Sequence, residues 1–280
     1  MQKKGRPAVI LPLDGSAIST TAYGAAAAMA DLIGASLHVV HVTEVKIREE
    51  ELLERLKLSP AQGQGITVRQ LQGSVVDSVL EYAFSVDAHL IVMSGHGETY
   101  NQRHLAGSTA LSIMQHATIP ILVLRSGIKR HPGPGWRPAK MLVPLDGSPE
   151  ATSAMDQVFH LAKELHADVD VLHIAVLGKE APKGEGAYSS PRYLDYPHYD
   201  WPAWSDEFIR RCYLPHREDV KLRLFHREGD PVTVTLDFAR EEGADLIALS
   251  WHGHMQRKLA STVKGILRRT DLPVLLIRTE

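Results

Sequence analysis

The sequence predicts an α/β protein made of two tandem copies of a five-stranded, parallel-sheet domain with Rossmann-like architecture. Apolar strands that alternate with helices along each half indicate a parallel sheet with helices on both faces. The repeat is far longer than the roughly 20 to 50 residues of a solenoid unit, so it indicates a duplicated domain. Three blocks occur twice in the same order: Pro12–Ser16 with Pro144–Ser148, Ala88–Gly97 with Ala244–Gly253, and Ile119–Arg125 with Leu272–Arg278.

Each element of the first half follows from a short pattern. Apolar runs predict strands near Ala8–Pro12, Leu37–Val42, Ile66–Gln72, His89–Ser94 and Ile121–Arg125. Helices are expected between them, near residues 18–33, 46–57, 74–86 and 108–116. The first helix has apolar residues at helical spacing in both copies, which predicts a shared buried face. Its positions are Ala22, Ala26, Met29 and Ile33, with Ala154, Val158, Leu161 and Leu165 as counterparts.

Differences between the halves predict the domain boundaries. We expect a first domain over residues 1–126, a linker rich in Pro and Gly over 127–138, and a second domain over 139–280. The second domain has an insertion at about 178–204. This insertion could be an irregular arm packed on its own domain, an inter-subunit contact or a cover over the crevice. Its aromatic residues are Tyr188, Tyr193, Tyr196, Tyr199, Trp201 and Trp204.

Composition excludes several classes of protein. With 280 residues, 44% hydrophobic and 23% charged, and a net charge of −2, the chain is typical of a globular protein and disfavours nucleic-acid binding. No apolar run approaches the roughly 18 to 20 residues that span a bilayer, and the N-terminal residues lead directly into a strand, so neither a membrane segment nor a signal peptide is expected. The single Cys212 fits a reducing compartment. We therefore expect a cytoplasmic protein.

An Asp turn follows the first strand of each copy. Asp14 and Asp146 are each followed by Gly, which permits a tight turn, and Ser16 or Ser19 could cap the first helix. Two interpretations stay open. The carboxylate could organise the turn by accepting backbone N–H groups, or it could accept hydrogen bonds from a ribose or a base in the crevice at the carboxyl end of the sheet.

A glycine loop follows the fourth predicted strand. Ser94-Gly95-His96-Gly97 is followed by nine residues and then by Gly107-Ser108-Thr109 at a helix start. Glycines let the backbone approach a ligand closely, and a helix N-terminus offers unpaired N–H groups and partial positive charge. The two hydroxyls add further donors. This pattern predicts an anion cradle.

Together these motifs resemble the universal stress protein family. The resemblance rests on Pro-x-Asp-x-Ser after strand one, His41-Val42 at the end of strand two, and a strand ending in Met before a Gly-x-x-Gly-x9-Gly-Ser/Thr loop, with a final Pro-apolar strand. It covers nearly the whole chain as two copies. It implies a fold related to the adenine nucleotide α-hydrolases, with ATP or another adenine nucleotide bound by some members.

The resemblance also implies a nucleotide site in the first copy, with Mg²⁺ as a candidate companion ion. Ser94 replaces the first Gly of the motif, and Glu98 stands where the family often has a basic residue. A carboxylate about 4 Å from a phosphate would cost about 1 kcal/mol in water and about 4 kcal/mol at an effective dielectric constant near 20. The implied site residues are Pro12, Asp14, Val42, Met93, Ser94, His96, Gly97, Gly107, Ser108 and Thr109.

The second copy departs from this pattern, because its loop after Gly253 is three residues shorter and ends in Ala260-Ser261-Thr262. We predict that its site is degenerate. Fifteen histidines invite a metal hypothesis, but His38 with His41, His96 with His104, and His252 with His254 match no recognised metal-ligand spacing. We therefore predict neither a metal site nor catalytic residues.

The last strand of each copy, Ile121–Arg125 and Val274–Arg278, would form a sheet edge. We expect the two to pair antiparallel, which would make the chain its own pseudo-dimer, and a homodimer of whole chains is plausible.

The predicted function is that of a nucleotide-responsive regulatory or protective stress protein, not a turnover enzyme. The alternatives are a nucleotide-independent protein-interaction scaffold and a slow ATPase, in which His96 or Asp14 would have to activate water.

Overall fold

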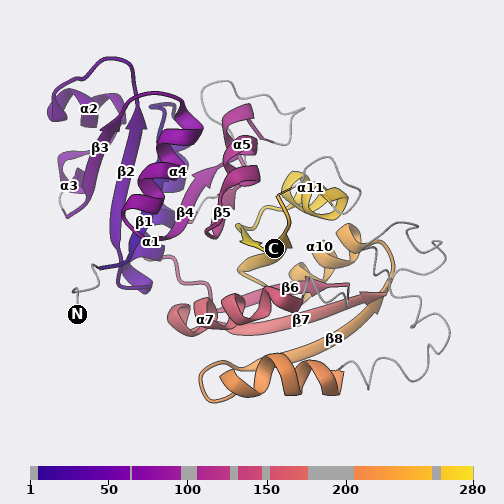
Figure 1. Ribbon diagram of the computed structural model, residues 1–280. Helices are drawn as coiled ribbons and strands as arrows, with labels where there is room; N and C mark the ends of the chain where they lie inside the picture. The colour runs from indigo at the N-terminus through magenta and orange to yellow at the C-terminus, as the bar shows by residue number, and fades with distance from the viewer. Residues whose placement is uncertain are drawn as a thin grey trace. The chain divides into compact units, whose positions relative to one another are not determined.

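The computed structural model describes residues 6–63, 65–95, 106–126, 132–146, 152–175, 205–253 and 260–279. The chain divides into two compact units (Figure 1). The first comprises Met1–Arg137, Gly253–Met255 and Asp271–Leu276, and the second comprises Pro138–His252, Gln256–Thr270 and Ile277–Glu280. A strand segment from the second copy thus belongs to the first unit. The predicted boundaries at 126 and 139 stay a prediction.

The first unit contains a parallel sheet with strand order β3-β2-β1-β4-β5. Because the chain passes from β1 to β2 and β3 on one side and then returns to β4 on the other, the strand order reverses between β1 and β4. Ligands of open α/β sheets bind at such a switch point. The strands are β1 (Ala8–Pro12), β2 (Ser36–Val42), β3 (Thr67–Leu71), β4 (Ala88–Ser94) and β5 (Ile121–Leu124).

The helices of the first unit lie close to the predicted ranges. The predicted helix over 18–33 begins as a 3-10 turn, because the hydroxyls of Ser19, Thr20 and Thr21 each donate to the carbonyl three residues earlier. A short helix that the sequence does not predict follows α2. The helices are η1 (Ser19–Ala22), α1 (Tyr23–Leu32), α2 (Glu49–Arg55), α3 (Pro60–Gly63), α4 (Val75–Ser85) and α5 (Ser108–His116).

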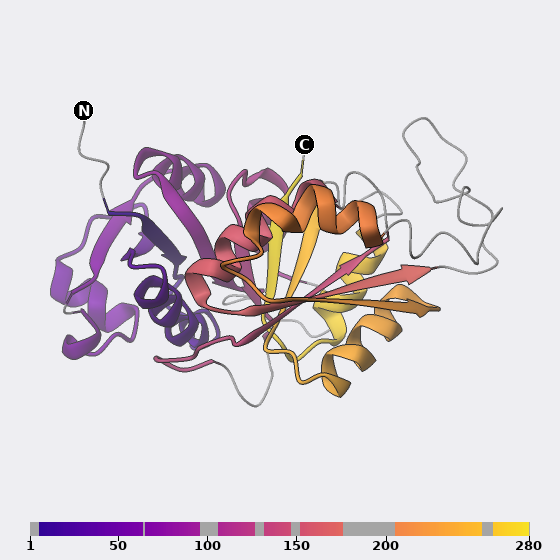
Figure 2. The same cartoon turned by 90° about the horizontal axis from the view of Figure 1, so that it is seen from below.

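The second unit repeats the parallel arrangement with the strand order β9-β6-β7-β8. Helices α10 and α11 lie side by side, and Figure 2 shows α10 and residues 205–216 on opposite sides of these strands. The strands are β6 (Lys140–Leu145), β7 (Asp168–Ala175), β8 (Leu222–Glu228), β9 (Leu246–Trp251) and β10 (Val274–Arg278). The helices are α7 (Met155–Leu165), a π-helix η2 (Ile209–Tyr213), η3 (Leu214–His216), α10 (Pro231–Glu241) and α11 (Ala260–Arg269).

Strand β5 also has an antiparallel neighbour in the part of β10 that belongs to the first unit. Val274 pairs with Val123, and Leu276 pairs with Ile121. Arg125 adds an ion pair to Asp271 at 3.0 Å. These are the two strands for which the sequence predicts antiparallel pairing.

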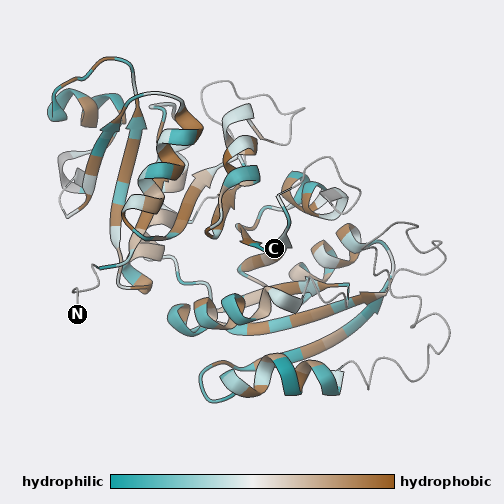
Figure 3. Cartoon of the chain, in the orientation of Figure 1, coloured by the Kyte–Doolittle hydropathy of each residue, from teal (hydrophilic) through white to brown (hydrophobic). Residues whose placement is uncertain are grey.

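Each unit has a core of buried central strands covered by the apolar faces of its longer helices, and in Figure 3 these strands are mostly brown while the helices mix brown with teal. The predicted helix face is wrong at two positions, because Ile33 and Leu161 are only half-buried. In α7 the neighbouring Phe159 and Ala162 are fully buried instead, since the buried stripe drifts around a helix with 3.6 residues per turn. Among the described residues, no helix is long and apolar enough to cross a membrane.

Candidate functional site

The Asp turn lies at the switch point of the first unit, directly after β1. The backbone N–H of Ser16 donates to Asp14 Oδ1 at 2.9 Å, and Gly15 between them adopts a φ of +87°. The Ser16 hydroxyl accepts the N–H of Ser19, the first residue of η1, at 3.0 Å. One Asp14 oxygen therefore organises the turn, as the first interpretation expects. Asp14 is exposed to solvent.

The end of β4 and the start of α5 are held together by backbone hydrogen bonds. Gly95 N donates to Leu124 O at 2.8 Å, and Gly107 N donates to Gly95 O at 2.8 Å. This second bond brings the N-terminus of α5 to the end of β4, where Ser108 and Thr109 are exposed in the first helical turn. The predicted site residues His96 and Gly97 lie outside the described residues, as does Glu98.

The other predicted site residues line the carboxyl ends of three strands. Pro12 ends β1 and Val42 ends β2, and both are half-buried. Met93 and Ser94 end β4 and are 5% and 7% exposed. The structure thus gathers the described members of the predicted set at one edge of the sheet. Those that are open to solvent are Asp14, Ser108 and Thr109.

His41, which the sequence marks as a motif residue and as half of a histidine pair, supports the Asp turn. His41 is 4% exposed, and its Nδ1 lies 2.8 Å from the carbonyl oxygen of Leu13. Among the described residues, its Nε2 has no hydrogen-bond partner. His41 therefore fixes the residue before Asp14 from the neighbouring strand β2. Sequence spacing could not reveal this contact, since it joins residues 28 positions apart.

The second copy has a different residue at the position where Gly95 stands in the first. Trp251 takes that place, ends β9 and is 3% exposed. Its carbonyl oxygen accepts the N–H of Thr279 at 3.0 Å, and the Thr279 hydroxyl lies 2.8 Å from His252 Nδ1. A buried tryptophan thus replaces the glycine whose carbonyl accepts the Gly107 N–H in the first copy. The predicted degeneracy of this copy stays a prediction, because residues 254–259 lie outside the described residues.

The counterpart of His41 in the second copy is His173, which is 4% exposed. Its ring stacks on that of His226, with centroids 5.2 Å apart and the two Nδ1 atoms separated by 3.1 Å. Burial, reinforced by the neighbouring His226 and opposed by Asp146, lowers the pKa of His173 to about 4. His173 is therefore neutral in the folded protein at neutral pH.

This shift predicts a loss of stability in acid. Below its ordinary pKa of 6.5, His173 binds a proton more readily in the unfolded chain than in the folded one. Stability should therefore fall as the pH drops from 6.5 towards 4, by about 2 kcal/mol at pH 5 from this residue. Urea unfolding measured between pH 7 and 4 should show a shallower decline for His173→Gln than for the wild type. The exposed His89→Gln control should follow the wild-type curve, and parallel curves for all three proteins would contradict the prediction.

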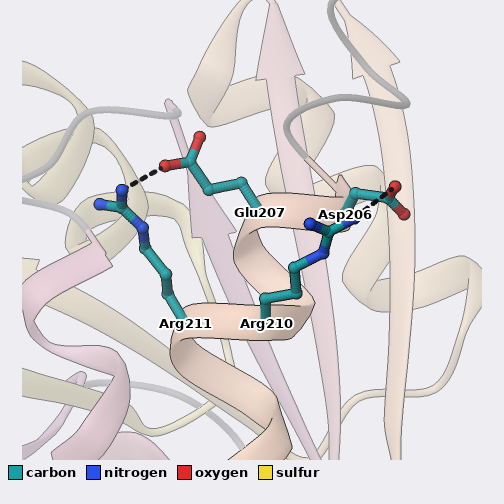
Figure 4. Close-up of a pocket in the computed structure, with 4 residues that line it drawn as sticks. All are labelled: Asp206, Glu207, Arg210 and Arg211. Carbon is teal, nitrogen blue, oxygen red and sulfur yellow. Dashed lines mark ion pairs between the residues drawn. The ribbon is translucent and has the colours of Figure 1, made fainter.

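A hollow of about 440 Å³ lies in the second unit, away from these residues. It is lined by two ion pairs of adjacent turns, Asp206 with Arg210 at 3.6 Å and Glu207 with Arg211 at 2.9 Å (Figure 4). All four side chains are at least 60% exposed, and their charges sum to zero. The hollow therefore offers a ligand neither burial nor an excess of charge.

The fold defines a doubly wound α/β protein that carries its unit twice. The model of the universal stress protein family matches residues 43–125 and 139–278. Universal stress protein YxiE of Bacillus subtilis is 27% identical over 148 residues, which cover 50% of this chain and 98% of that protein. Universal stress protein MJ0531 of Methanocaldococcus jannaschii is 28% identical over 137 residues, covering 42% of this chain and 81% of that protein.

A solved universal stress protein from Archaeoglobus fulgidus has a similar fold along nearly the whole chain. Its TM-score is 0.63 at 16% identity, and the match covers 97% of this chain and 96% of that one. The chain belongs to the universal stress protein family. Of the two matched segments, the first begins at residue 43 and so does not include the Asp turn.

Proposed function

We propose that this chain is a nucleotide-responsive regulatory protein that binds an adenine nucleotide in the crevice of its first unit. The observation that supports this proposal most directly is the 2.8 Å hydrogen bond from Gly107 N to Gly95 O, which places the N-terminus of α5 beside the end of β4. Asp14 and Gly95 each lie four residues beyond the paired Ile10 and Ile91. The carboxylate and the helix N-terminus therefore belong to the same edge of the sheet, on the two strands that flank the switch point.

The two halves of this crevice suit the two ends of a nucleotide. The exposed carboxylate of Asp14 accepts the Ser16 N–H and can also accept hydrogen bonds from ribose hydroxyls, because each carboxylate oxygen has more than one lone pair. The first turn of α5 offers backbone N–H groups, the hydroxyls of Ser108 and Thr109 and partial positive charge to the phosphates. In our proposal, a Mg²⁺ ion held by those phosphates offsets the negative charge of Glu98.

The proposed role is regulatory because the crevice supports binding and orientation more clearly than chemistry. A ligand that contacts residues 95–107 can shift the population of a surface that a partner recognises. The second unit, with Trp251 in place of a glycine, would supply scaffold and not a second nucleotide site. We place this function in the cytoplasm, since the single Cys212 suits a reducing compartment.

Native mass spectrometry tests the nucleotide part directly. Protein exchanged into a volatile buffer and mixed with ATP, with and without Mg²⁺, should show one nucleotide per chain. Absence of an adduct at millimolar ATP would contradict the proposal. The same spectra give the mass of the assembly, and this mass decides whether whole chains form a homodimer.

The scaffold alternative draws on two observations. One Asp14 oxygen is already engaged by its own turn, and Trp251 fills the corresponding glycine position of the second copy. A protein complex from the native source that survives nucleotide removal and addition unchanged would favour the scaffold. Nucleotide that is retained through purification would count against it.

A further inference from the structure

The second unit contains a cluster of side chains that sequence spacing did not reveal. Asp156 and His160 lie one turn apart on α7, and His216 ends η3 after the aromatic insertion. One potential ligand atom from each residue lies within 4.8 Å of the others. It is the one group of this kind among the described residues. We propose that Asp156, His160 and His216 form a binding site for a divalent transition-metal ion, with Zn²⁺ as the expected occupant.

The distances within the cluster suit a tetrahedral metal. Zn²⁺ binds imidazole nitrogen and carboxylate oxygen at about 2.0 to 2.2 Å, so ligand atoms around one ion lie about 3.3 Å apart. His216 Nε2 is 3.0 Å from Asp156 Oδ1, and one potential ligand atom of each residue, His160 included, lies within 4.8 Å of the others. Rotation of the exposed Asp156 and His160 side chains would bring three donors around one ion. Two imidazoles and one carboxylate are also a ligand set that Zn²⁺ accepts.

The histidines are oriented by contacts other than those between the proposed ligand atoms, as metal ligands usually are. His160 Nδ1 lies 2.8 Å from the backbone carbonyl oxygen of Asp156, so this nitrogen donates its proton and the lone pair is left on Nε2. The ring of His216 stacks on Phe159, with centroids 5.1 Å apart and planes inclined by 27°. Phe159 is itself fully buried. The least exposed ligand is thereby held in place before any ion arrives.

The site has both a buried wall and an open side. The side chain of His216 is 9% exposed, whereas those of Asp156 and His160 are 72% and 65% exposed. An ion could enter from solvent and keep a water molecule as its fourth ligand. The nearest basic side chain on the same helix, Lys163, is paired with Asp219 at 2.7 Å. A bound ion would join α7 to residues 205–216, which follow the aromatic insertion.

Zinc competition against a chromophoric chelator tests the proposal on the full-length protein after metal removal. The wild type should take up zinc, and His160→Ala should lower the affinity of one site at least about tenfold. His216→Ala and Asp156→Asn should do the same. His160→Ala is the deciding variant, because its exposed ring can be removed without opening the core. Far-UV circular dichroism confirms that each variant is folded.

The matched control is His116→Ala. His116 also lies on a helix, and its Nδ1 makes the same bond to the carbonyl four residues earlier, Ser112 O at 2.8 Å, but it belongs to no such cluster. His116→Ala should leave the zinc titration unchanged. Zinc bound by other histidines would be common to all variants. The test of the proposed site is therefore the difference in zinc affinity between the wild type and His160→Ala. Identical titrations for these two proteins, or no zinc uptake by the wild type, would overturn the proposal.

The zinc site and the nucleotide crevice belong to different units, so their tests are independent. A variant that abolishes nucleotide binding in the first unit should titrate with zinc as the wild type does. Likewise, His160→Ala should bind nucleotide as the wild type does.

Discussion

Gly107→Asp is expected to abolish nucleotide binding while leaving the fold intact. Gly107 is the N-cap of α5, with φ −62° and ψ 157°, a conformation that any L-residue can adopt. Aspartate is a favourable N-cap residue, so the substitution should not weaken the helix. Its carboxylate, however, would stand where the proposed phosphates bind. Repulsion at about 4 Å is about 4 kcal/mol at an effective dielectric constant near 20, which is close to a thousandfold loss of affinity.

Isothermal titration with ATP measures this loss, and thermal unfolding of the same samples reports on the fold. Ser261→Asp is the matched control, because it places the same charge in the first turn of α11, one residue beyond the position that corresponds to Gly107 in the second copy. It should leave affinity unchanged. Equal losses for both variants would point to a general charge effect, and unchanged binding by Gly107→Asp would remove the phosphate cradle from the proposal.

Arg223→Ala is expected to lower the free energy of unfolding by about 3 kcal/mol at pH 7. Asp170 on β7 is 1% exposed, and its two oxygens accept from Arg223 Nε at 2.8 Å and Nη2 at 2.6 Å. The same Nη2 reaches Glu242 at 2.8 Å. Removing the guanidinium leaves a buried carboxylate without its cation. The expected loss of stability lies at the low end of the range for a broken buried ion pair, because the Arg223 side chain is 48% exposed and water can reach Asp170 once it is removed.

Urea unfolding measures this loss of stability, with Arg240→Ala as the control. That substitution breaks an exposed ion pair in which Arg240 lies 2.8 Å from Asp237. Surface pairs contribute up to about 1 kcal/mol, so the control should change stability little. Arg223→Lys should fall between the two, since it keeps the charge but loses the two-pronged geometry. A cost for Arg223→Ala no larger than that of Arg240→Ala would contradict the burial argument.

Local patterns predicted the elements of the first half closely, because strand and helix periodicity depend on neighbours in sequence. The predicted helix over 108–116 matches α5, and the strand over 8–12 matches β1. The predicted helix over 18–33 differs where short hydroxyl side chains bond to their own backbone and tighten the first turn. In α7 the predicted buried face differs from the observed one at Leu161, because the sequence pattern does not show where the helix meets the sheet.

The residues of the candidate site could be named from the sequence, but the contacts between them could not. The Asp turn, the strand end and the start of α5 could be named from motifs, and the described members do lie at one edge of the sheet. The contact of His41 with Leu13 could not be named, because it crosses between neighbouring strands.

By itself, the sequence determined that this protein is a duplicated α/β chain of the universal stress protein type and that the two copies differ after their glycine loops. Those properties are carried by residues close together in the chain. Only the tertiary structure decided which distant side chains meet: Asp170 with Arg223, His173 with His226, and Asp156 with His216. Each pair is separated by 53 to 60 residues. Parallel strands joined by crossovers, and helices packed on their faces, bring such residues together in a register that no local spacing records.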